Sequence, residues 1–377
     1  MKNLFYSLYA LFFNLSRRLF RLKDNRIAFV APHNGGKNDS LGVMRRYVEE
    51  KGEFETVFIS TNDLKINSSS PVKSLIKAVS FFTVGAKRLA EAKYVFLNDN
   101  FMPMAKLNFS PDAVVTMLWH AEGAFKKFGL SAPVSDEIRS REKKCSEKLD
   151  YIICSSKNVV PAYAEAFGTD ESKVIPLGSP RIDELLSDCD TAELRSAFDK
   201  AHPECRGKKL VLYAPTFREN PEADAALLSH IDTGNFSDAL GSEYSLLIKL
   251  HPQINSASPL SGAVDVTNED IGLLTHICDI LITDYSSVCM DFALLSKPCI
   301  FFAFDLESYE KERSFYYDYP GYVPGEVVTT FDGVIENIKN PRKSEEKLRS
   351  FREFNFDYFD CGNTKRIYDF VIQARKR

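Results

Sequence analysis

The sequence predicts an α/β protein that contains two Rossmann-like domains. Short apolar runs, rich in β-branched and aromatic residues, alternate with helix-compatible segments in both halves of the chain. Such alternation is typical of parallel sheets with right-handed crossover connections. The length of 377 residues is also more than one hydrophobic core usually fills. We therefore expect one parallel sheet in each half.

The expected strands follow one another at regular intervals along the chain. In the first half they are RIAFVAP (26–32), ETVFIS (55–60), YVFLND (94–99), VVTMLW (114–119), YIICSS (151–156) and VIPLG (174–178). In the second half they are KLVLYAP (209–215), YSLLIKLHP (244–252), AVDVTN (263–268), ILITDYS (280–286) and PCIFFAF (298–304). The polar stretch 187–209 between the halves predicts a helix and a linker. We place the domains at 25–190 and 191–377.

Residues 1–24 form a separate segment with an unusual pattern. An apolar, aromatic run from Leu4 to Leu15 precedes Arg17, Arg18 and Arg21. The run is shorter than the roughly 20 apolar residues of a transmembrane helix, and its charges follow the run, unlike those of a signal peptide. We expect an amphipathic helix in the membrane interface, with its aromatic side chains inserted, which predicts a peripheral protein at the cytoplasmic face of the membrane. A helix packed in the protein core is the alternative.

Composition excludes several classes of protein. With 44% hydrophobic residues, 27% charged residues and a net charge of -4, the chain is globular, and its bulk charge does not favour nucleic-acid binding. Its eight cysteines include no C-x-x-C pair, so we expect reduced thiols and no zinc site. Asp188 and Asp190 match a metal-binding D-x-D pattern, but they directly precede a predicted helix and are better explained as caps. We predict no metal site.

Polar residues follow many of the predicted strands at the point where each strand ends. In open parallel sheets, ligands bind beyond the carboxyl ends of the strands, where the crossover direction switches. These positions are therefore candidates for a binding site. They include His120, Arg181, Thr216, Arg218, His251 and the segment Asp284-Tyr285-Ser286-Ser287.

The segment "ITDYSSVCMDF" predicts an anion site. A strand that ends at Asp284, followed by Ser286 and Ser287 and then a helix, presents hydroxyl groups and free backbone N–H groups together. The segment "IKLHP" supports this interpretation, because Pro252 should end a strand and leave His251 exposed near Lys249. Plain helix capping and an ordinary strand end are the alternatives.

Six motifs in this order resemble the CDP-glycerol glycerophosphotransferase family of teichoic-acid synthesis. They are WHAEGAFKKFG, LGSPRIDEL, YAPTFRE, IKLHP, TDYSSVCMDFALLSKPCIFF and DLESYEKERSFYYDYPGYVPGEVV, and the resemblance runs from about residue 112 onward. It implies a GT-B-like fold with two domains that face a central cleft. It also implies CDP-glycerol as the donor and a membrane lipid-linked saccharide as the acceptor. The WHAEG form is closest to the primase-like members, although Glu122 departs from the family pattern.

The implied reaction assigns roles to the candidate residues. An acceptor hydroxyl would attack the phosphorus that bears glycerol, and CMP would leave. His120 is the predicted general base, because its ordinary pKa lies near working pH. His251 is the second predicted catalytic residue. The predicted donor-binding residues are Ser286, Ser287, Arg313, Lys249, Thr216, Arg218 and Asp284. We expect no cofactor apart from the substrate CDP-glycerol.

Other functions remain open at this level. A CDP-ribitol-using phosphotransferase and a GT-B glycosyltransferase would both suit the predicted fold, since fold does not fix chemistry. A non-catalytic nucleotide-binding assembly protein is a third possibility, which the presence of His120 and His251 disfavours. The sequence predicts neither an oligomeric state nor a metal requirement.

Overall fold

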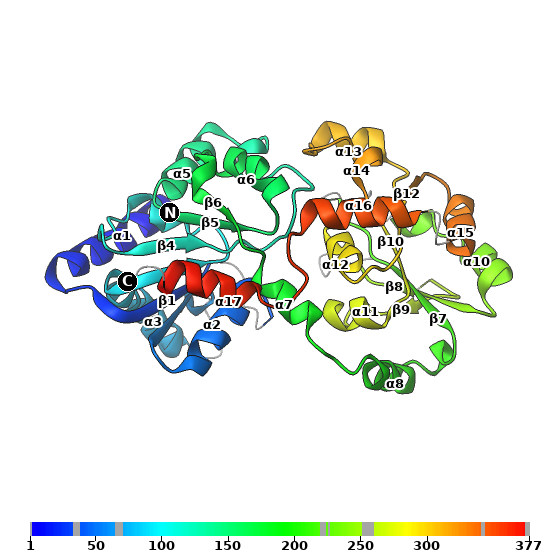
Figure 1. Cartoon of the computed structure of the whole chain (residues 1–377), viewed down its shortest axis with the longest axis horizontal. Coiled ribbons are helices and arrows are strands. Elements are labelled where there is room, and N and C mark those ends of the chain that lie inside the picture. The colour runs from blue at the N-terminus through cyan, green and yellow to red at the C-terminus, as the bar shows by residue number, and fades with distance from the viewer. Residues whose placement is uncertain are drawn as a thin grey trace. The chain divides into compact units, whose positions relative to one another are not determined.

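The computed structural model describes residues 2–32, 38–64, 71–218, 224, 227–250, 260–340 and 344–373. It divides into two compact units, Met1–Ser187 with Asn355–Arg377, and Asp188–Phe354. Each unit contains its own six-stranded sheet with helices around it (Figure 1). The predicted α/β class with one parallel sheet in each half is confirmed. The central cleft stays a prediction.

The first sheet is parallel throughout. Its strands are β1 (Lys23–Ala31), β2 (Glu55–Ser60), β3 (Ala92–Leu97), β4 (Val114–Met117), β5 (Tyr151–Cys154) and β6 (Val174–Pro176). Their order is β2-β1-β3-β4-β5-β6. The direction of strand addition reverses between β1 and β3, which makes that edge the expected ligand position.

The second sheet has the strand order of a dinucleotide-binding fold. Its strands are β7 (Lys209–Tyr213), β8 (Tyr244–Ile248), β9 (Val264–Asp265), β10 (Ile280–Thr283), β11 (Cys299–Phe302) and β12 (Gly325–Val328). The order β12-β11-β10-β7-β8-β9 is again parallel, and it reverses between β7 and β10. The segments after these two strands, which contain Arg218 and Asp284, therefore meet at a switch point.

All eleven predicted strands are present, and β12 is an additional one. It begins with Gly325, a residue that is depleted in strands. A Cβ at this position would lie 2.0 Å from the carbonyl oxygen of Cys299 in the neighbouring strand. Only glycine allows this close approach of the two backbones.

Helices connect the strands of both sheets (Figure 1). In the first unit they are α1 (Lys2–Leu19), α2 (Ser40–Lys51), α3 (Pro71–Ser80), α4 (Ala86–Ala90), α5 (Asp136–Ser146), α6 (Val160–Phe167), α7 (Pro180–Leu186) and α17 (Asn363–Tyr368). The π-helical turns η2 (Phe81–Gly85) and η9 (Asp369–Gln373) adjoin α3 and α17. In the second unit they are α8 (Thr191–Ala201), α10 (Thr233–Leu240), α11 (Ile271–Ile277), α12 (Val288–Leu294), α13 (Leu306–Glu312), α14 (Tyr319–Tyr322), α15 (Phe331–Lys339) and α16 (Glu345–Asn355).

Short 3₁₀ turns complete the described elements. They are η1 (Thr61–Leu64), η3 (Met102–Lys106), η4 (Gly129–Ser131), η5 (Lys157–Val159), η6 (Glu171–Lys173) and η7 (Pro203–Cys205). Before α8, the carboxylate of Asp190 accepts a hydrogen bond from the Glu193 backbone N–H at 2.9 Å. The prediction that the D-x-D pattern caps a helix is therefore confirmed.

The segment around α17 belongs to the first unit. Ile367, Val371 and Ile372 are fully buried in the same core as Ile27 of β1. Asp183 in α7 accepts hydrogen bonds from the backbone N–H groups of Asn363 and Thr364, at 3.0 and 2.7 Å. The division in the structure therefore differs from the predicted domain 191–377, because Asn355–Arg377 belongs to the first unit.

Helix α1 packs against the first unit through an aromatic face. The buried ring of Tyr9 lies 5.0 Å from that of Phe81 and 5.2 Å from that of Phe101. The expectation that the aromatic side chains face a membrane is wrong for Tyr9 and Phe13, which are buried. The exposed stripe consists of leucines instead: Leu4, Leu8, Leu11, Leu15 and Leu19. Within the described part of the chain, no helix is long and apolar enough to cross a membrane.

Candidate functional site

His120 lies at the carboxyl edge of the first sheet, just after β4. Its Nδ1 is 3.2 Å from the Asn98 carbonyl oxygen and 3.7 Å from Oδ2 of Asp99. Because a carbonyl oxygen can only accept, the hydrogen bond to Asn98 places the proton on Nδ1. Nε2 then has a free lone pair, and the side chain is 48% exposed. This is the arrangement that a general base requires.

The residue before His120 has a strained backbone. Trp119 has a φ of 61°, in the left-handed region that bulky residues avoid. Its buried indole stacks on Phe128 at 5.1 Å, and Phe167 packs edge-on against it at 5.2 Å. Backbone strain of this kind costs about 1–3 kcal/mol and persists only where the surroundings enforce it. The packing of Trp119 therefore fixes the direction of His120.

A chain of hydrogen bonds connects His120 to the switch point between β1 and β3. Asp39 caps α2 by accepting from the Gly42 backbone N–H at 2.7 Å. Its other carboxylate oxygen accepts from the side-chain amide of Asn98 at 3.0 Å. Sequence reasoning missed Asn98 and Asp99, although they are the last two residues of a predicted strand. Residues 33–37, which precede Asp39 in the sequence, lie outside the described residues.

Glu122 is buried and stabilises the loop that follows β4. This buried carboxylate accepts hydrogen bonds from the Ser179 hydroxyl at 2.9 Å and from Arg181 Nε at 3.1 Å. Burial opposes the charge, but Arg181 and Ser179 outweigh it and hold the pKa of Glu122 below its ordinary value. The unusual residue in the WHAEG motif is thus an ionised brace between the loop after β4 and the start of α7.

Replacing Glu122 by glutamine is expected to destabilise the protein in a pH-dependent way. A carboxyl group with a lowered folded-state pKa stabilises the fold above its unfolded-state pKa, and this stabilisation is lost as pH falls through the folded-state pKa. We expect Glu122→Gln to lower the unfolding free energy at pH 7 by about 1.5–3 kcal/mol, the value of hydrogen bonds to a charged group. The difference should shrink below about pH 4, near the ordinary pKa of glutamate.

Urea unfolding of both proteins between pH 3 and pH 7 measures this difference. Glu165→Gln is the matched control, because Glu165 lies exposed on α6. Its effect should stay within about 0.5 kcal/mol at every pH. A Glu122→Gln deficit that stayed the same down to pH 3 would show that the charge of Glu122 is not what stabilises the loop.

Asp284 directly follows β10 and organises the switch point of the second sheet. Its buried Oδ1 accepts from the Thr216 backbone N–H at 2.8 Å, and Oδ2 accepts from Arg218 Nη2 at 2.7 Å. The Tyr319 hydroxyl donates to the Asp284 carbonyl oxygen at 2.9 Å. The segments after β7 and β10 are therefore fastened together by one carboxylate.

Arg218 is at the centre of a buried ion-pair cluster. Its guanidinium also donates to Asp305, with Nε 2.8 Å from Oδ2, and lies 5.0 Å from the ring centroid of Tyr285. Burial opposes the charge, but Asp284 and Asp305 raise the pKa of Arg218 above its ordinary value. The side chain is only 6% exposed. Arg218 thus shapes the switch point, and its predicted role as a donor ligand stays a prediction.

Ser286 and Ser287 lie between this cluster and α12. Ser286 is half-buried and accepts from the Val288 backbone N–H at 3.4 Å, whereas Ser287 is exposed and its hydroxyl does not cap the helix. The hydroxyl of Thr216 is buried, and the described part of the chain provides no hydrogen-bond partner for it. The structure thus brings three of the predicted donor-binding hydroxyl groups to one edge of the second sheet.

The other predicted donor ligands have different surroundings. Lys249 donates to the carbonyl oxygens of Thr267 and Glu269, at 2.9 and 2.6 Å. Burial lowers its pKa despite nearby carboxylates. The exposed Arg313 follows α13, and its charge opposes the rise that burial causes in the pKa of Tyr309. His251 lies outside the described residues, so its role stays a prediction.

Metal ligands do not cluster in the described ranges. No group of three or more His, Cys, Asp or Glu side chains there could hold a metal ion.

The sequence matches a family model over most of its length. Residues 11–373 match the model described as CDP-Glycerol:Poly(glycerophosphate) glycerophosphotransferase. The teichoic acid poly(ribitol-phosphate) polymerase of Bacillus spizizenii is 32% identical over 362 residues, which are 94% of this chain and 57% of that protein. The teichoic acid glycerol-phosphate primase of Bacillus subtilis is 25% identical over 338 residues, 86% of this chain and 83% of that protein. The chain thus spans little more than half the length of that polymerase.

Solved structures share the fold. The wall teichoic acid polymerase TagF, in a variant soaked with CDPG, has a TM-score of 0.77 and 25% identity, covering 99% of this chain and 95% of that chain. The UDP-GlcNAc 2-epimerase of Neisseria meningitidis shares the fold alone, with a TM-score of 0.59, 14% identity and coverage of 93% and 100%. Both agree with the expected GT-B-like class. The family model, which matches residues 11–373, shows that the chain belongs to the CDP-glycerol:poly(glycerophosphate) glycerophosphotransferase family.

Proposed function

We propose that this protein transfers glycerol phosphate from CDP-glycerol to a hydroxyl group of a membrane lipid-linked saccharide and releases CMP. The observation that carries the proposal is the geometry of His120. Its Nδ1 lies within hydrogen-bond distance of a backbone carbonyl oxygen, and its side chain is half-exposed at the carboxyl edge of a sheet. Family membership supplies the class of reaction, since the fold alone does not fix it.

In the proposed reaction, His120 Nε2 accepts the proton of the acceptor hydroxyl. The hydroxyl oxygen forms a bond to the phosphorus that bears glycerol. The bond from this phosphorus to the oxygen that bridges the two phosphates breaks, and CMP leaves with that oxygen and its electron pair. Ser286 and Ser287 donate hydrogen bonds to the donor phosphates, and the cluster around Arg218 holds these serines in place.

The second question is whether the donor carries glycerol or ribitol, because the chain is similar to enzymes named for each polyol phosphate. The ribitol-phosphate primase of Bacillus spizizenii is 32% identical over 295 residues, and the glycerol-phosphate primase of the same organism is 28% identical over the same length. This difference favours CDP-ribitol as the alternative donor.

A donor panel tests the proposal directly. The protein is incubated with a lipid-linked disaccharide and with CDP-glycerol, CDP-ribitol or UDP-sugars, and nucleotide release and product mass are followed. We expect CMP release with CDP-glycerol and a product that has gained glycerol phosphate. Faster turnover of CDP-ribitol would establish the alternative. Transfer of a sugar from a UDP-sugar, or CDP binding without turnover, would contradict both.

We also propose that the first unit binds the cytoplasmic face of the membrane. Among the described residues, twelve of the fifteen exposed large hydrophobic side chains lie on α1, β2 or the helical run 71–90, or just after α1. Monomeric soluble proteins rarely expose so concentrated an apolar surface. Exposed basic residues accompany these side chains, among them Arg18, Arg21, Lys73 and Lys77. This combination suits a bilayer with anionic headgroups.

Substituting the exposed leucines is expected to release the protein from membranes. The structure favours Leu8→Gln/Leu11→Gln/Leu15→Gln over truncation, because removing α1 would also uncover the buried partners of Tyr9. Inserting one leucine contributes about 1.5–3 kcal/mol, so partitioning into anionic vesicles should fall at least tenfold. Vesicle sedimentation measures it.

The chain provides a matched control for this experiment. Within the described ranges, Ile138, Ile271 and Phe359 are the exposed large hydrophobic residues outside the proposed surface. Substituting all three by glutamine removes a similar amount of exposed apolar area. We expect vesicle binding of this control to stay within twofold of wild type. Equal losses in the two triple variants would contradict the assignment of the membrane surface.

A further inference from the structure

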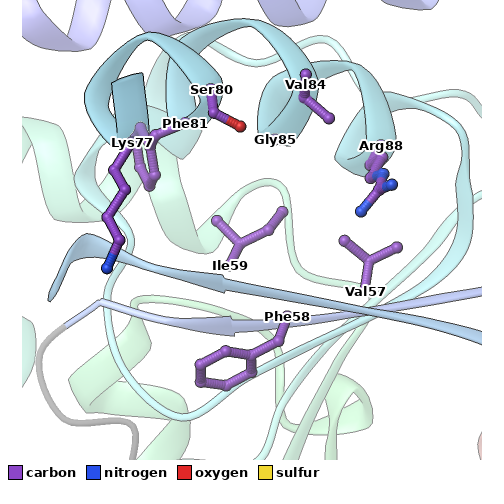
Figure 2. A pocket seen from close by; sticks show the side chains of 9 residues that line it. All are labelled: Val57, Phe58, Ile59, Lys77, Ser80, Phe81, Val84, Gly85 and Arg88. Atoms are coloured by element: carbon purple, nitrogen blue, oxygen red, sulfur yellow. The ribbon is translucent and has the colours of Figure 1, made fainter. Parts of the chain in front are cut away.

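A cavity lies between the edge strand β2 and the helical run formed by α3, η2 and α4 (Figure 2). Its volume is about 180 Å³. One water molecule occupies about 30 Å³ in the liquid, so the cavity has room for a phosphate group and the first atoms attached to it. Val57 and Ile59 form its strand side, and Ser80 and Val84 form its helix side. None of the residues that line it belongs to the site around His120.

The cavity has a positive electrostatic character. Lys77 and Arg88 both line it and lie on opposite sides in Figure 2. Counting only described residues, neither side chain makes a hydrogen bond or an ion pair, and no acidic residue lines the cavity. Arg88 contributes to the lowered pKa of Glu55, but that carboxylate is held mainly by Arg26, at 2.7 and 2.8 Å. Two cations therefore face a small space without a neutralising partner.

The lining residues of the helical run share one face. Lys77 precedes Ser80 by three residues and Phe81 by four, and Val84 and Arg88 follow at the same kind of spacing, as residues on one side of a helix do. The π-helical turn from Phe81 to Gly85 lies in the middle of this face. Such turns occur often at functional sites. The Ser80 hydroxyl points into the cavity from this side (Figure 2).

The cavity shares two exposed residues, Phe58 and Val84, with the proposed membrane surface. The exposed Val84 lines the cavity, and Val72, Leu75, Ile76 and Val79 are exposed on the same helical run. Phe81 connects the two features, because its ring lines the cavity and also packs 5.0 Å from that of Tyr9 in α1. A ligand with a phosphate group at one end and a hydrocarbon chain at the other would meet a suitable group at each end.

We propose that this cavity binds the phosphate headgroup of an anionic phospholipid, with Lys77 and Arg88 as the charged ligands and the acyl chains along the exposed face of α3. The Ser80 hydroxyl adds a donor. Bound in this way, one lipid would fix the rotational orientation of the first unit on the bilayer, which an apolar stripe alone does not define. The inference rests on the proposed membrane association, and a bilayer-free assay separates the two.

Dihexanoyl phosphatidylglycerol, kept below its critical micelle concentration, is the probe for this assay. Isothermal titration calorimetry on the full chain should show saturable binding of one lipid. Inorganic phosphate and dihexanoyl phosphatidylcholine are the comparison ligands, and we expect each to bind at least tenfold more weakly. Phosphate binding as strong as that of the lipid would overturn the lipid assignment in favour of a bare anion site.

Gly85→Leu fills the cavity without changing its charge. Gly85 has helical backbone angles, and a Cβ there would meet only the Ser80 carbonyl oxygen, at an ordinary contact distance of 3.6 Å. Lys77→Ala/Arg88→Ala removes the charge without filling the cavity. Each should weaken lipid binding by about tenfold or more, the usual effect of losing one or two hydrogen bonds to a charged group. The double alanine variant keeps the test valid if Gly85→Leu fails to fold.

Lys73→Ala/Arg18→Ala is the charge-matched control, because Lys73 lies on α3 with Lys77, Arg18 lies on α1, and neither lines the cavity. It should bind the soluble lipid within twofold of wild type. The Leu8→Gln/Leu11→Gln/Leu15→Gln variant should also bind the soluble lipid normally, although it no longer binds vesicles. If vesicle binding failed for wild type but the soluble lipid still bound in the cavity, only the membrane proposal would fall. Absence of saturable lipid binding, or equal weakening in the cavity and control variants, would overturn the cavity proposal.

Discussion

His120→Ala is expected to slow the transfer step by about 10²–10⁴-fold, the usual effect of removing a general base. The structure gives the reason, because the hydrogen bond from Nδ1 to the Asn98 carbonyl oxygen leaves Nε2 free to accept a proton. The nearby carboxylate of Asp99 lies 3.7 Å from Nδ1, on the side of the ring away from the Nε2 lone pair. Single-turnover measurements with saturating CDP-glycerol isolate this step from binding and product release.

His276→Ala is the histidine-matched control for that experiment. His276 lies near the end of α11, directly before β10 begins, and therefore at the edge of the sheet opposite the switch point. Its single-turnover rate should stay within twofold of wild type. A His120→Ala rate close to the wild-type rate, in a folded protein, would remove His120 from the chemistry.

Arg218→Ala is expected to cause the largest loss of stability. The substitution leaves the buried carboxylate of Asp284 and the neighbouring Asp305 without their shared cation. Breaking a buried ion pair by removing one partner costs about 3–5 kcal/mol, because the remaining charge is uncompensated. Urea unfolding of the wild type and the variant, followed by a spectroscopic signal that reports on the second unit, measures the loss of unfolding free energy.

The exposed ion pair between Lys209 and Glu243 provides the comparison. It has a similar N–O distance, 2.7 Å, but both side chains are more than half exposed. Exposed pairs contribute about 0–1 kcal/mol, so Lys209→Ala should change stability little. If Arg218→Ala destabilised the protein no more than Lys209→Ala, the cluster would not be what holds the switch point together.

The strands could be predicted because their signal is local. Each expected run combines apolar residues with a polar or turn-forming end, and both properties are visible within a few residues. The exception, β12, depends on a contact between Gly325 and Cys299, which are distant in sequence. The assignment of residues 367–372 to the first unit had the same difficulty, because the core that buries them includes Ile27 at the other end of the chain.

The candidate site was only partly predictable for the same reason. Residues that end strands, such as His120 and Asp284, follow from the geometry of parallel sheets. The hydrogen-bond and ion-pair partners of these residues do not follow from that geometry. Asp305 reaches Arg218 across 87 residues, and the Asn355 side chain accepts from the Ala124 backbone N–H across 231 residues. Without these pairings, a buried structural arginine and an open phosphate ligand have the same sequence pattern.

The division of roles between the two units is the central claim, and donor affinity tests it most directly. Calorimetric titration of CDP-glycerol should give nearly the same affinity for wild type and His120→Ala, because His120 is proposed to act only on the acceptor. Ser286→Ala should bind the donor about one to two decades more weakly, the effect of losing a hydrogen bond to a charged phosphate. Loss of donor binding in His120→Ala together with wild-type affinity in Ser286→Ala would contradict the account.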